Sequence, residues 1–388
     1  MPNTWLSNSL WPAIRIKYIC SECFSGGTPD TTNSSYWNNG TIPWIASGEL
    51  QNCDVNNATN YITIKGLSNS SARLIRKDSV AVAMTGATCA NVGYINFDTS
   101  ANQSVYAYVM KGNQNARFAY YSLIAMRDEI LSKQNGGAQA GINGVVCKNL
   151  YIPKLDLQKQ EQIVNYLDKK VGIIDRLIEN INQQIEDLRL FKFSMISEYT
   201  SSQTLNKYKI KYKNTIVDKK SEFDGQPYFA LENIVSGSGE YIDTDAEYST
   251  KGATVCKEND ICFGKLRPYL RKYFFVTKKT TCSTEFAVFR EKIPTKYMYY
   301  LIQSEEFLQL CNAFSEGTKM PRINIEKLKN WKFGFPSVEE QKIFVKNMDA
   351  VSTKIEQLIQ IKRQKIMELK EYKKSLIYEC VTGKKEVL

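Results

Sequence analysis

Apolar residues near the middle of the chain recur alternately four and three positions apart. This spacing places them in one stripe along a helix and is typical of a coiled-coil seam. No proline lies inside the stretch, so we expect one uninterrupted helix. The seam residues are Leu167, Val171, Ile174, Ile178, Ile181, Ile185 and Leu188.

The helical stretch occurs twice in the chain. Residues 160–198 match residues 341–379 without a gap, 181 positions later. The second seam carries Ser352 and Lys362 at two of its positions, and polar seam residues usually fix register and partner. Each copy would span roughly 60 Å at about 1.5 Å per residue, which is long for a core helix. The second seam is Met348, Ser352, Ile355, Ile359, Lys362, Ile366 and Leu369.

The repeat extends upstream of the helices, so each unit is a globular domain followed by a long helix. Two units are too few for a solenoid, whose repeats stack at least three deep, and a pseudo-two-fold pair is expected instead. Antiparallel helices would let the second domain fold locally and would place the domains at opposite ends. The upstream matches are Gly136 with Gly317, Ile142 with Ile323, and Asn143 with Asn324.

The sequence therefore predicts an α+β fold: two similar mixed α/β domains separated by two long antiparallel coiled-coil helices. The predicted parts are residues 1–155, 156–200, 201–336 and 337–388. In the first domain, strands at 14–19, 43–50, 80–84 and 92–97 precede a helix at 118–132 and a strand ending at residue 153. In the second, strands at 208–212, 227–234, 260–263, 273–276 and 286–289 precede a helix at 296–314.

Composition narrows the chemistry that the chain can perform. The sequence contains no histidine, which excludes Ser-His-Asp and Cys-His catalysis, histidine-ligated metals and a histidine general base. The formal net charge is +11, and most of the excess lies on the two domains rather than on the first helix. Basic domains suit a phosphate-rich partner, although a merely soluble basic protein would have the same charge.

Targeting and metal signals are weak. No apolar run is long enough to cross a membrane and no leader segment stands out, so a cytoplasmic protein is expected. Of the ten cysteines, only Cys20 and Cys23 have metal-ligand spacing, without a second pair or a histidine to complete a site. Reduced, buried thiols and no bound metal are the expectation.

The most informative loop covers residues 264–273, between two predicted strands of the second domain. Basic residues interleaved with tyrosines suit phosphate contacts and reading of base edges, and arginine is the best guanine reader. A solvated basic hairpin is the alternative. The equivalent loop of the first domain, with Thr85 and Asn91, lacks the charge, so two DNA-binding domains would read different sequences. The second-domain candidates are Lys265, Arg267, Tyr269, Arg271 and Lys272.

A second pair of loops precedes the matched residues Asn143 and Asn324. In the first domain this loop offers Lys133, Gln134 and Asn135, and in the second it offers Lys319 and Arg322. Loops at matching places on two domains could face one duplex together. They could equally be plain helix-to-strand connections.

No catalytic signature stands out. No methyltransferase motif of the form Asn/Asp-Pro-Pro-aromatic, no glycine-rich nucleotide loop and no paired-acid metal site stands out in the sequence. The chain is therefore predicted not to be an enzyme.

Several motifs together resemble the specificity subunit of type I restriction-modification systems. The helical motifs are Leu-Asp-Leu-Gln-Lys-Gln-Glu-Gln-Ile-Val-Asn-Tyr-Leu-Asp at 155–168, Phe-Pro-Ser-Val-Glu-Glu-Gln at 335–341 and Leu-Ile-Tyr-Glu-Cys-Val-Thr-Gly-Lys at 376–384. Gly-Gly-Thr-Pro at 26–29 and Lys-Leu-Arg-Pro-Tyr at 265–269 look like pieces of that family's target-recognition domains. The likeness covers essentially the whole chain.

The resemblance implies a set of partners. Each domain would bind one half of a split target in double-stranded DNA, and the helix pair would act as a spacer and dock two methyltransferase subunits. Those partners would bring S-adenosylmethionine, and motor-nuclease subunits would bring ATP and magnesium, with no cofactor on this chain.

Two other classes of function remain open from the residues alone. One is a scaffold whose coiled coil assembles other proteins while the domains bind protein or RNA. The other is a self-contained nuclease or methyltransferase, which the missing motifs argue against.

Overall fold

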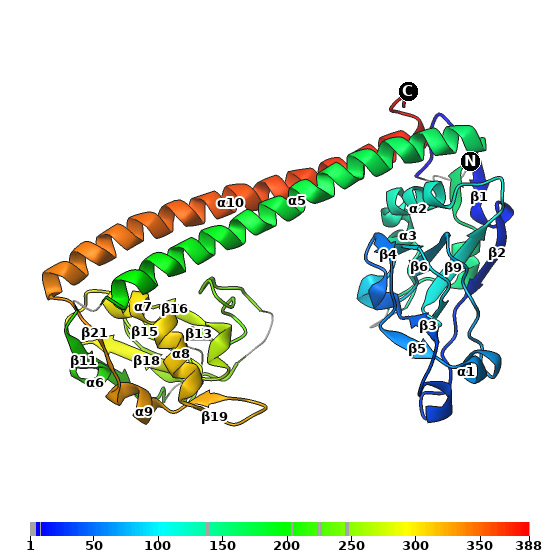
Figure 1. The fold of residues 1–388 in the computed structure, drawn as a ribbon. Coiled ribbons are helices and arrows are strands. Elements are labelled where there is room, and N and C mark those ends of the chain that lie inside the picture. The colour runs from blue at the N-terminus through cyan, green and yellow to red at the C-terminus, as the bar shows by residue number, and fades with distance from the viewer. Residues whose placement is uncertain are drawn as a thin grey trace. The chain divides into compact units, whose positions relative to one another are not determined.

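A computed structural model describes residues 5–7, 9–136, 140–202, 205–222, 225, 227–244 and 248–387. The chain divides into two compact units, Met1–Glu179 with Ile366–Leu388, and Asn180–Lys365. Each unit holds one globular head and the adjoining parts of two long helices, α5 (Leu157–Thr200) and α10 (Val338–Thr382) (Figure 1). These helix bounds confirm the two predicted helices. The four-part division of the chain stays a prediction, because the units divide the helices between them.

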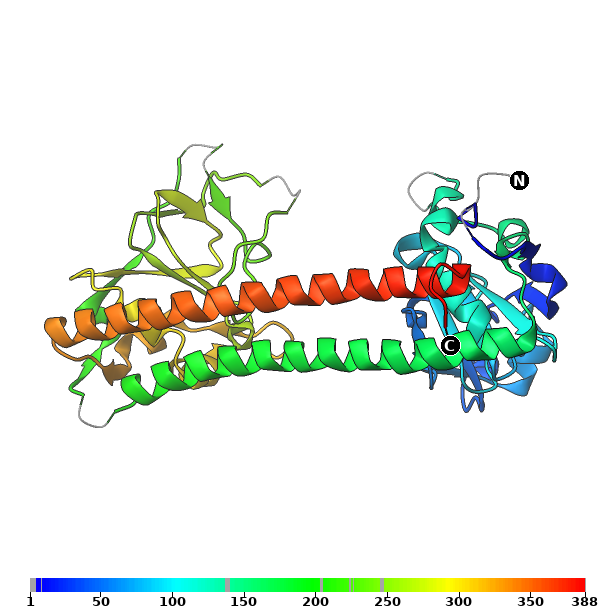
Figure 2. The ribbon, with the colours of Figure 1, turned by 90° about the horizontal axis from the view of Figure 1, so that it is seen from above.

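The predicted seams are confirmed: every seam position on both helices is buried or half-buried. In the first unit, Lys159 Nζ lies 3.5 Å from the carbonyl oxygen of Val387, and Lys373 Nζ lies 2.7 Å from Asp175 Oδ1. Contacts that move backward along α10 as they move forward along α5 define antiparallel packing. Figures 1 and 2 show the two helices side by side within this unit.

The second unit has the same antiparallel arrangement. The rings of Tyr199 and Phe344 stack with centroids 4.0 Å apart, and Lys192 Nζ lies 3.9 Å from Glu356 Oε1. The polar seam residue Lys362 donates to Gln184 Oε1 at 2.5 Å. The Lys192–Glu356 pair is the repeat equivalent of the Lys373–Asp175 pair in the first unit, so both units use the same interhelical bond.

The first head contains a five-stranded sheet, a three-stranded sheet and one terminal strand pair. The five-stranded sheet has the order β2 (Cys20–Ser25), β9 (Val105–Met110), β6 (Ser79–Ala83), β7 (Val92–Ile95), β4 (Cys53–Val55). The three-stranded sheet has the order β5 (Asn60–Ile62), β3 (Ile42–Ile45), β8 (Ser100–Ala101), and β1 (Ala13–Arg15) pairs with β10 (Tyr151–Pro153). The helices are α1 (Ile64–Ser68), α2 (Ala116–Ala125), α3 (Arg127–Ser132) and α4 (Gly144–Lys148).

The second head repeats this plan with shorter elements. Its four-stranded sheet has the order β12 (Asn214–Val217), β18 (Phe286–Glu291), β15 (Ile261–Gly264), β16 (Tyr273–Phe275). The smaller sheets are β13 (Tyr228–Phe229), β17 (Thr280–Cys282), β14 (Thr254–Cys256); β11 (Lys207–Lys209) with β21 (Lys332–Gly334); and β19 (Ser315–Glu316) with β20 (Arg322–Ile323). The helices are α6 (Ile210–Lys213), α7 (Tyr297–Leu301), α8 (Glu305–Ala313) and α9 (Ile325–Asn330).

Strand register confirms that the two heads are structural repeats. Ala81 of β6 lies opposite Gly93 and Ala107, and Cys262 of β15 lies opposite Phe274 and Val288. Each of these second-head positions is 181 residues beyond its first-head counterpart. The helical repeat found in the sequence therefore extends through the central strands of both heads.

The heads pack onto the long helices through continuous hydrophobic cores. In the first unit, Tyr108 and Tyr121 belong to the same buried cluster as Leu167 of α5 and Leu376 of α10. Equivalent polar ties stand at the edge of each core: Arg117 Nε lies 3.0 Å from Asp168 Oδ1, and Lys296 Nζ lies 2.7 Å from Asp349 Oδ1. Each head is thus built on its helices rather than joined to them by a free linker.

Several predicted elements are shorter or broken in the structure. The strand predicted at 14–19 is β1 followed by a turn of 3-10 helix, Ile16–Tyr18. The helix predicted at 118–132 breaks at Met126 into α2 and α3, and the one at 296–314 breaks before Ser304, whose hydroxyl caps α8. The strand predicted at 227–234 reduces to β13, because Asn233 Oδ1 accepts from Ala230 N and closes a turn. Periodicity detected these apolar positions but not the local capping that ends the elements.

Among the described residues, no helix is long and apolar enough to cross a membrane.

Shortening a seam residue tests the packing of α5 on the first head. Leu167 is fully buried, and Leu167→Ala should lower the free energy of unfolding by about 2–5 kcal/mol because a cavity forms. Leu177, on the same helix, is 47% exposed, and Leu177→Ala should cost no more than about 0.5–1 kcal/mol. Urea unfolding of the two variants compares them, and equal losses would contradict this packing.

Candidate nucleic-acid interface

In the second head, the two loops predicted to be functional lie against each other. The backbone N–H of Arg267 donates to the carbonyl oxygen of Pro321 at 2.7 Å, and Ile323 N donates to Lys265 O at 3.0 Å. Between these bonds, Leu266 and Arg322 form an antiparallel bridge. The structure therefore brings Lys265, Arg267 and Arg322 together.

The first head has the same backbone ladder at the equivalent positions. Gly86 N donates to Ala140 O at 3.3 Å, Ile142 N donates to Met84 O at 2.8 Å, and Thr85 bridges to Gly141. Each of these residues lies 181 positions before its counterpart in the second head. The two heads therefore share one backbone arrangement at this place, which we call the backbone template.

The ladder also reaches the second predicted loop of each head. Asn135 N donates to Gly141 O at 2.9 Å, so Thr85 and Asn135 flank Gly141 on either side. In the second head, Glu316 pairs with Arg322 in the same way, between β19 and β20. The candidate interface of each head is therefore one small surface made by both loops.

Two backbone positions in each template adopt the left-handed conformation. Gly86 has φ +68° and its equivalent Arg267 has φ +48°; Ala90 has φ +66° and its equivalent Arg271 has φ +49°. This conformation is open to glycine but costs other residues roughly 1–2 kcal/mol. The second head places arginines there nonetheless, and backbone strain of this kind concentrates at functional sites.

The cations of the second head differ in how freely they are presented. Arg322 Nη2 lies 2.6 Å from Glu285 Oε1, and the Lys265 backbone N–H donates to Glu285 O at 2.7 Å. Burial lowers the pKa of the half-buried Lys265 ammonium, with Glu285 acting against that shift. Arg267 Nε and the second carboxylate oxygen of Glu285 are buried without a hydrogen-bond partner among the described residues. Buried polar atoms without partners are costly, and a ligand that supplies one would be favoured.

Two predicted residues are held by the protein itself. Arg271 Nη2 lies 2.7 Å from Glu305 Oε2, and its guanidinium stands 5.1 Å from the ring centroid of Phe193 on α5. Lys272 Nζ donates to the carbonyl oxygen of Leu231 at 2.7 Å. Their side chains tie the loop to its own head.

Tyr269 and Lys319 extend outward from the second head. The side chain of Tyr269 is 52% exposed, beside the buried Pro268. Lys319 is exposed and has no side-chain hydrogen bond or ion pair to any described residue. These two residues and Arg322 are exposed, whereas Arg267 is half-buried and its Nε is covered.

The first-head surface is polar but carries little charge. Lys133 Nζ pairs with Glu129 at 3.2 Å, one helical turn away on α3, and Gln134 is half-buried. Asn91 Oδ1 accepts weakly from Asn52 Nδ2 at 3.5 Å and Arg127 Nη2 at 3.4 Å. The loop at residues 85–94 itself contains no arginine or lysine.

Sequence reasoning missed some neighbours of these surfaces. Arg127 stands beside Asn91, although it lies 36 residues away in the chain. Sequence reasoning also missed a surface pocket of the second head, which Tyr228, Tyr241 and Tyr248 line together with Asn233. The sequence signal that could have indicated this pocket is the set of tyrosines among acidic and amide residues along residues 228–248.

No cluster of metal-ligating side chains lies at either surface among the described residues. Among the described residues, one group is close enough to hold an ion, and it lies in the core of the second head.

Comparison with known proteins identifies the fold and the family. A family model described as the type I restriction modification DNA specificity domain matches residues 8–187 and again residues 198–371. The chain belongs to this family. Membership confirms the resemblance found in the sequence and the assignment as a non-catalytic DNA specificity subunit, and it does not favour the scaffold alternative.

The specificity subunit of the type I restriction enzyme EcoR124I/EcoR124II of Escherichia coli is 27% identical over 168 residues, 42% of each chain. This chain therefore spans less than half the length of that relative. The MjaIX specificity subunit of Methanocaldococcus jannaschii is 25% identical over 97% of this chain and 94% of its own.

A chain from a solved structure on complex assembly and conformational transition of the type I R-M system shares the fold. Its TM-score is 0.69 at 14% identity, over 96% of this chain and 98% of that one.

The bridge at Gly141 offers a test of the shared ladder. A Cβ on Gly141 would lie 2.7 Å from the carbonyl oxygen of Met84, so Gly141→Ala should displace the ladder at a cost of about 1–3 kcal/mol. Hydrogen exchange at the amides of Gly86 and Ile142 should then accelerate by about tenfold or more. Arg322→Ala is the matched control, because it keeps its Cβ and should leave the equivalent amides protected. Unchanged exchange in Gly141→Ala would show that the ladder does not restrain this loop.

Proposed function

We propose that this specificity subunit reads a bipartite asymmetric target in double-stranded DNA, one half with each head. The proposal rests on the observation that both heads have the same backbone ladder but different residues in it. Thr85 and Gly141 of the first head occupy the positions of Leu266 and Arg322 in the second. One backbone template would present two different sets of groups to base edges. Reading different half-sites requires this combination of a constant frame and variable side chains.

Charge supports unequal reading by the two heads. The second-head surface offers Arg267 and Arg322, and arginine recognises guanine through two hydrogen bonds in the major groove. The first-head surface offers Thr85, Gln134 and Asn135, of which the amides suit adenine and the hydroxyl suits either base. The first half-site is therefore expected to depend less on guanine than the second.

The long helices would serve the rest of the complex, in the cytoplasm. They expose apolar side chains that neither head covers, and exposed apolar groups in such numbers mark sites for partner proteins. We assign these faces to two methyltransferase subunits, which would bind S-adenosylmethionine, while motor-nuclease subunits would bind ATP and magnesium. The exposed residues are Ile173, Leu177, Leu190, Phe191, Leu358, Ile361 and Met367.

Replacing Arg267 tests base reading by the second head. In the complex with its methyltransferase subunits, selection from a random duplex library gives the preferred sequence of both half-sites. Arg267→Ala should weaken binding to that sequence by about 1–3 kcal/mol and relax the preference in one half-site alone. The matched control is Arg271→Ala, whose guanidinium is already bound to Glu305 and which should leave the base preference unchanged.

Lys319→Ala separates base reading from phosphate contact. Loss of a phosphate contact should weaken all sequences alike and reduce the slope of log affinity against log salt by about one. If Arg267→Ala behaved like Lys319→Ala, Arg267 would not read a base. Equal affinity of the parent complex for every duplex would reject sequence reading altogether.

A further inference from the structure

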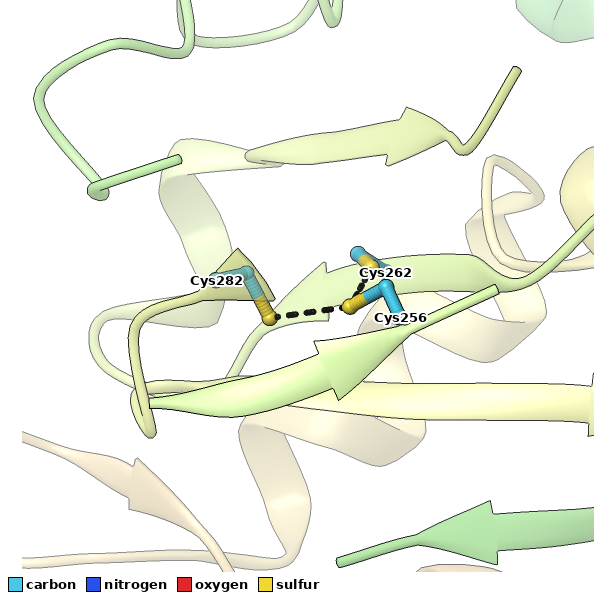
Figure 3. Close-up of side chains that lie close together, drawn as sticks. All are labelled: Cys256, Cys262 and Cys282. Atoms are coloured by element: carbon cyan, nitrogen blue, oxygen red, sulfur yellow. Dashed lines mark hydrogen bonds between the residues drawn. The ribbon is translucent and has the colours of Figure 1, made fainter. Parts of the chain in front are cut away.

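Three thiols meet in the core of the second head, from three different strands. Cys256 of β14 has its Sγ 3.4 Å from Cys282 Sγ on β17 and 3.9 Å from Cys262 Sγ on β15 (Figure 3). All three sulfur atoms lie within 4.8 Å of one another, and all three residues are fully buried. We call this group the cysteine cluster. It joins the four-stranded sheet to the three-stranded sheet.

The first head fills the same place without sulfur. At the equivalent positions, 181 residues earlier, stand Ile75, Ala81 and Ala101, each fully buried. The equivalence is one of register, because Cys256 lies opposite Thr280 as Ile75 lies opposite Thr99. Packing in this fold therefore does not require thiols at these positions. The second head differs from the first at all three together.

The sulfur–sulfur distances in the cysteine cluster are close to those between thiolate ligands of one metal ion. A zinc–thiolate bond of about 2.3 Å sets neighbouring sulfur atoms about 3.8–4.0 Å apart around one ion. The separation of 3.9 Å falls in that range and the one of 3.4 Å lies just below it, so small side-chain rotations would complete the site. Soft thiolates select d10 ions such as Zn(II) and Cu(I). We propose that the cysteine cluster binds one such ion through three thiolates.

The ligand set defines the chemistry of binding. A divalent ion that replaces the three S–H protons would form three metal–sulfur bonds, release three protons to solvent and leave a net charge of −1. No other cysteine or carboxylate among the described residues joins the group, so a zinc ion would keep one coordination position for a further ligand, and the full burial of the three cysteines favours a structural role. Lys220 Nζ donates to Thr254 Oγ1 at 3.2 Å, on the strand of Cys256, and brings positive charge to that strand.

The ion would anchor β15, which leads into the loop of Lys265 and Arg267, and β17, which leads to Glu285 beside that loop. Cys262 lies three residues before Lys265, and Cys282 lies three residues before Glu285, whose carbonyl oxygen accepts from Lys265 N. An effect on DNA reading would follow, and that consequence alone rests on the proposed function. Metal binding itself can be tested without DNA.

The test compares the full chain with a variant that copies the first head. Cys256→Ile, Cys262→Ala and Cys282→Ala together install residues that the same fold already packs, so the variant should remain folded by circular dichroism. Each protein, purified under reducing conditions without a histidine tag, is titrated with Zn(II) and separately with Cu(I), each against a chromophoric chelator. We expect one ion per parent chain, bound at least a hundredfold more tightly than by the triple variant. The metal that meets this criterion identifies the occupant.

Further variants keep the test decisive. If the triple variant fails to fold, Cys282→Ala alone should weaken binding at least tenfold, since two thiolates remain. Cys53, which is exposed, provides the matched control: Cys53→Ser should retain full binding. Equal metal binding by parent and triple variant, no binding by the parent, or a Cys256–Cys282 disulfide that forms in place of metal binding would each overturn the proposal.

Discussion

The packing of each head onto the long helices is the constraint on which the remaining structure depends. Leu167 of α5 is fully buried in the core that also contains Tyr108 and Tyr121 of the first head. In the second unit, Tyr300 of the head and Phe344 of α10 belong to one core in the same way. Since the cores are continuous, a head cannot rotate on its helices without exposing buried apolar surface. The loops that follow the strands of each sheet are therefore held by elements that are themselves fixed.

In both heads, backbone hydrogen bonds set the conformation of the interface loops, whereas the side chains on these loops differ. The ladder at Gly141 and at Arg322 is made by backbone groups, so both heads form it although their side chains there differ. Glycine and arginine satisfy the left-handed position at residues 86 and 267 equally in geometry but not in energy. Under the proposed function, a constant backbone with variable side chains would let one fold read two different DNA sequences without a change in the helices or the head cores.

Much of the architecture could be predicted because its signals are local or repeated. The four-and-three spacing gave the helices, and the single offset that relates residues 160–198 to 341–379 also relates the strands and the ladders of the two heads. The breaks at Met126 and before Ser304 escaped prediction because they depend on capping rather than on periodicity. The sequence named Lys265, Arg267 and Arg322 as candidates but did not predict that their two loops pair. The side-chain bonds of Arg271 and Lys272 to Glu305 and Leu231 were not predictable either, because these partners are distant in sequence. The cysteine cluster was invisible for the same reason, because its members come from three strands and lack metal-ligand spacing along the chain.

The central claim is that two unlike heads on one template read two different half-sites. The most direct measurement is to co-express the chain with its methyltransferase subunit and to map methylated adenines across a host genome by long-read sequencing. This account predicts one split motif with two different halves and a fixed gap. Methylation at unrelated sites, a motif with identical halves, or no methylation despite a stable complex would contradict it.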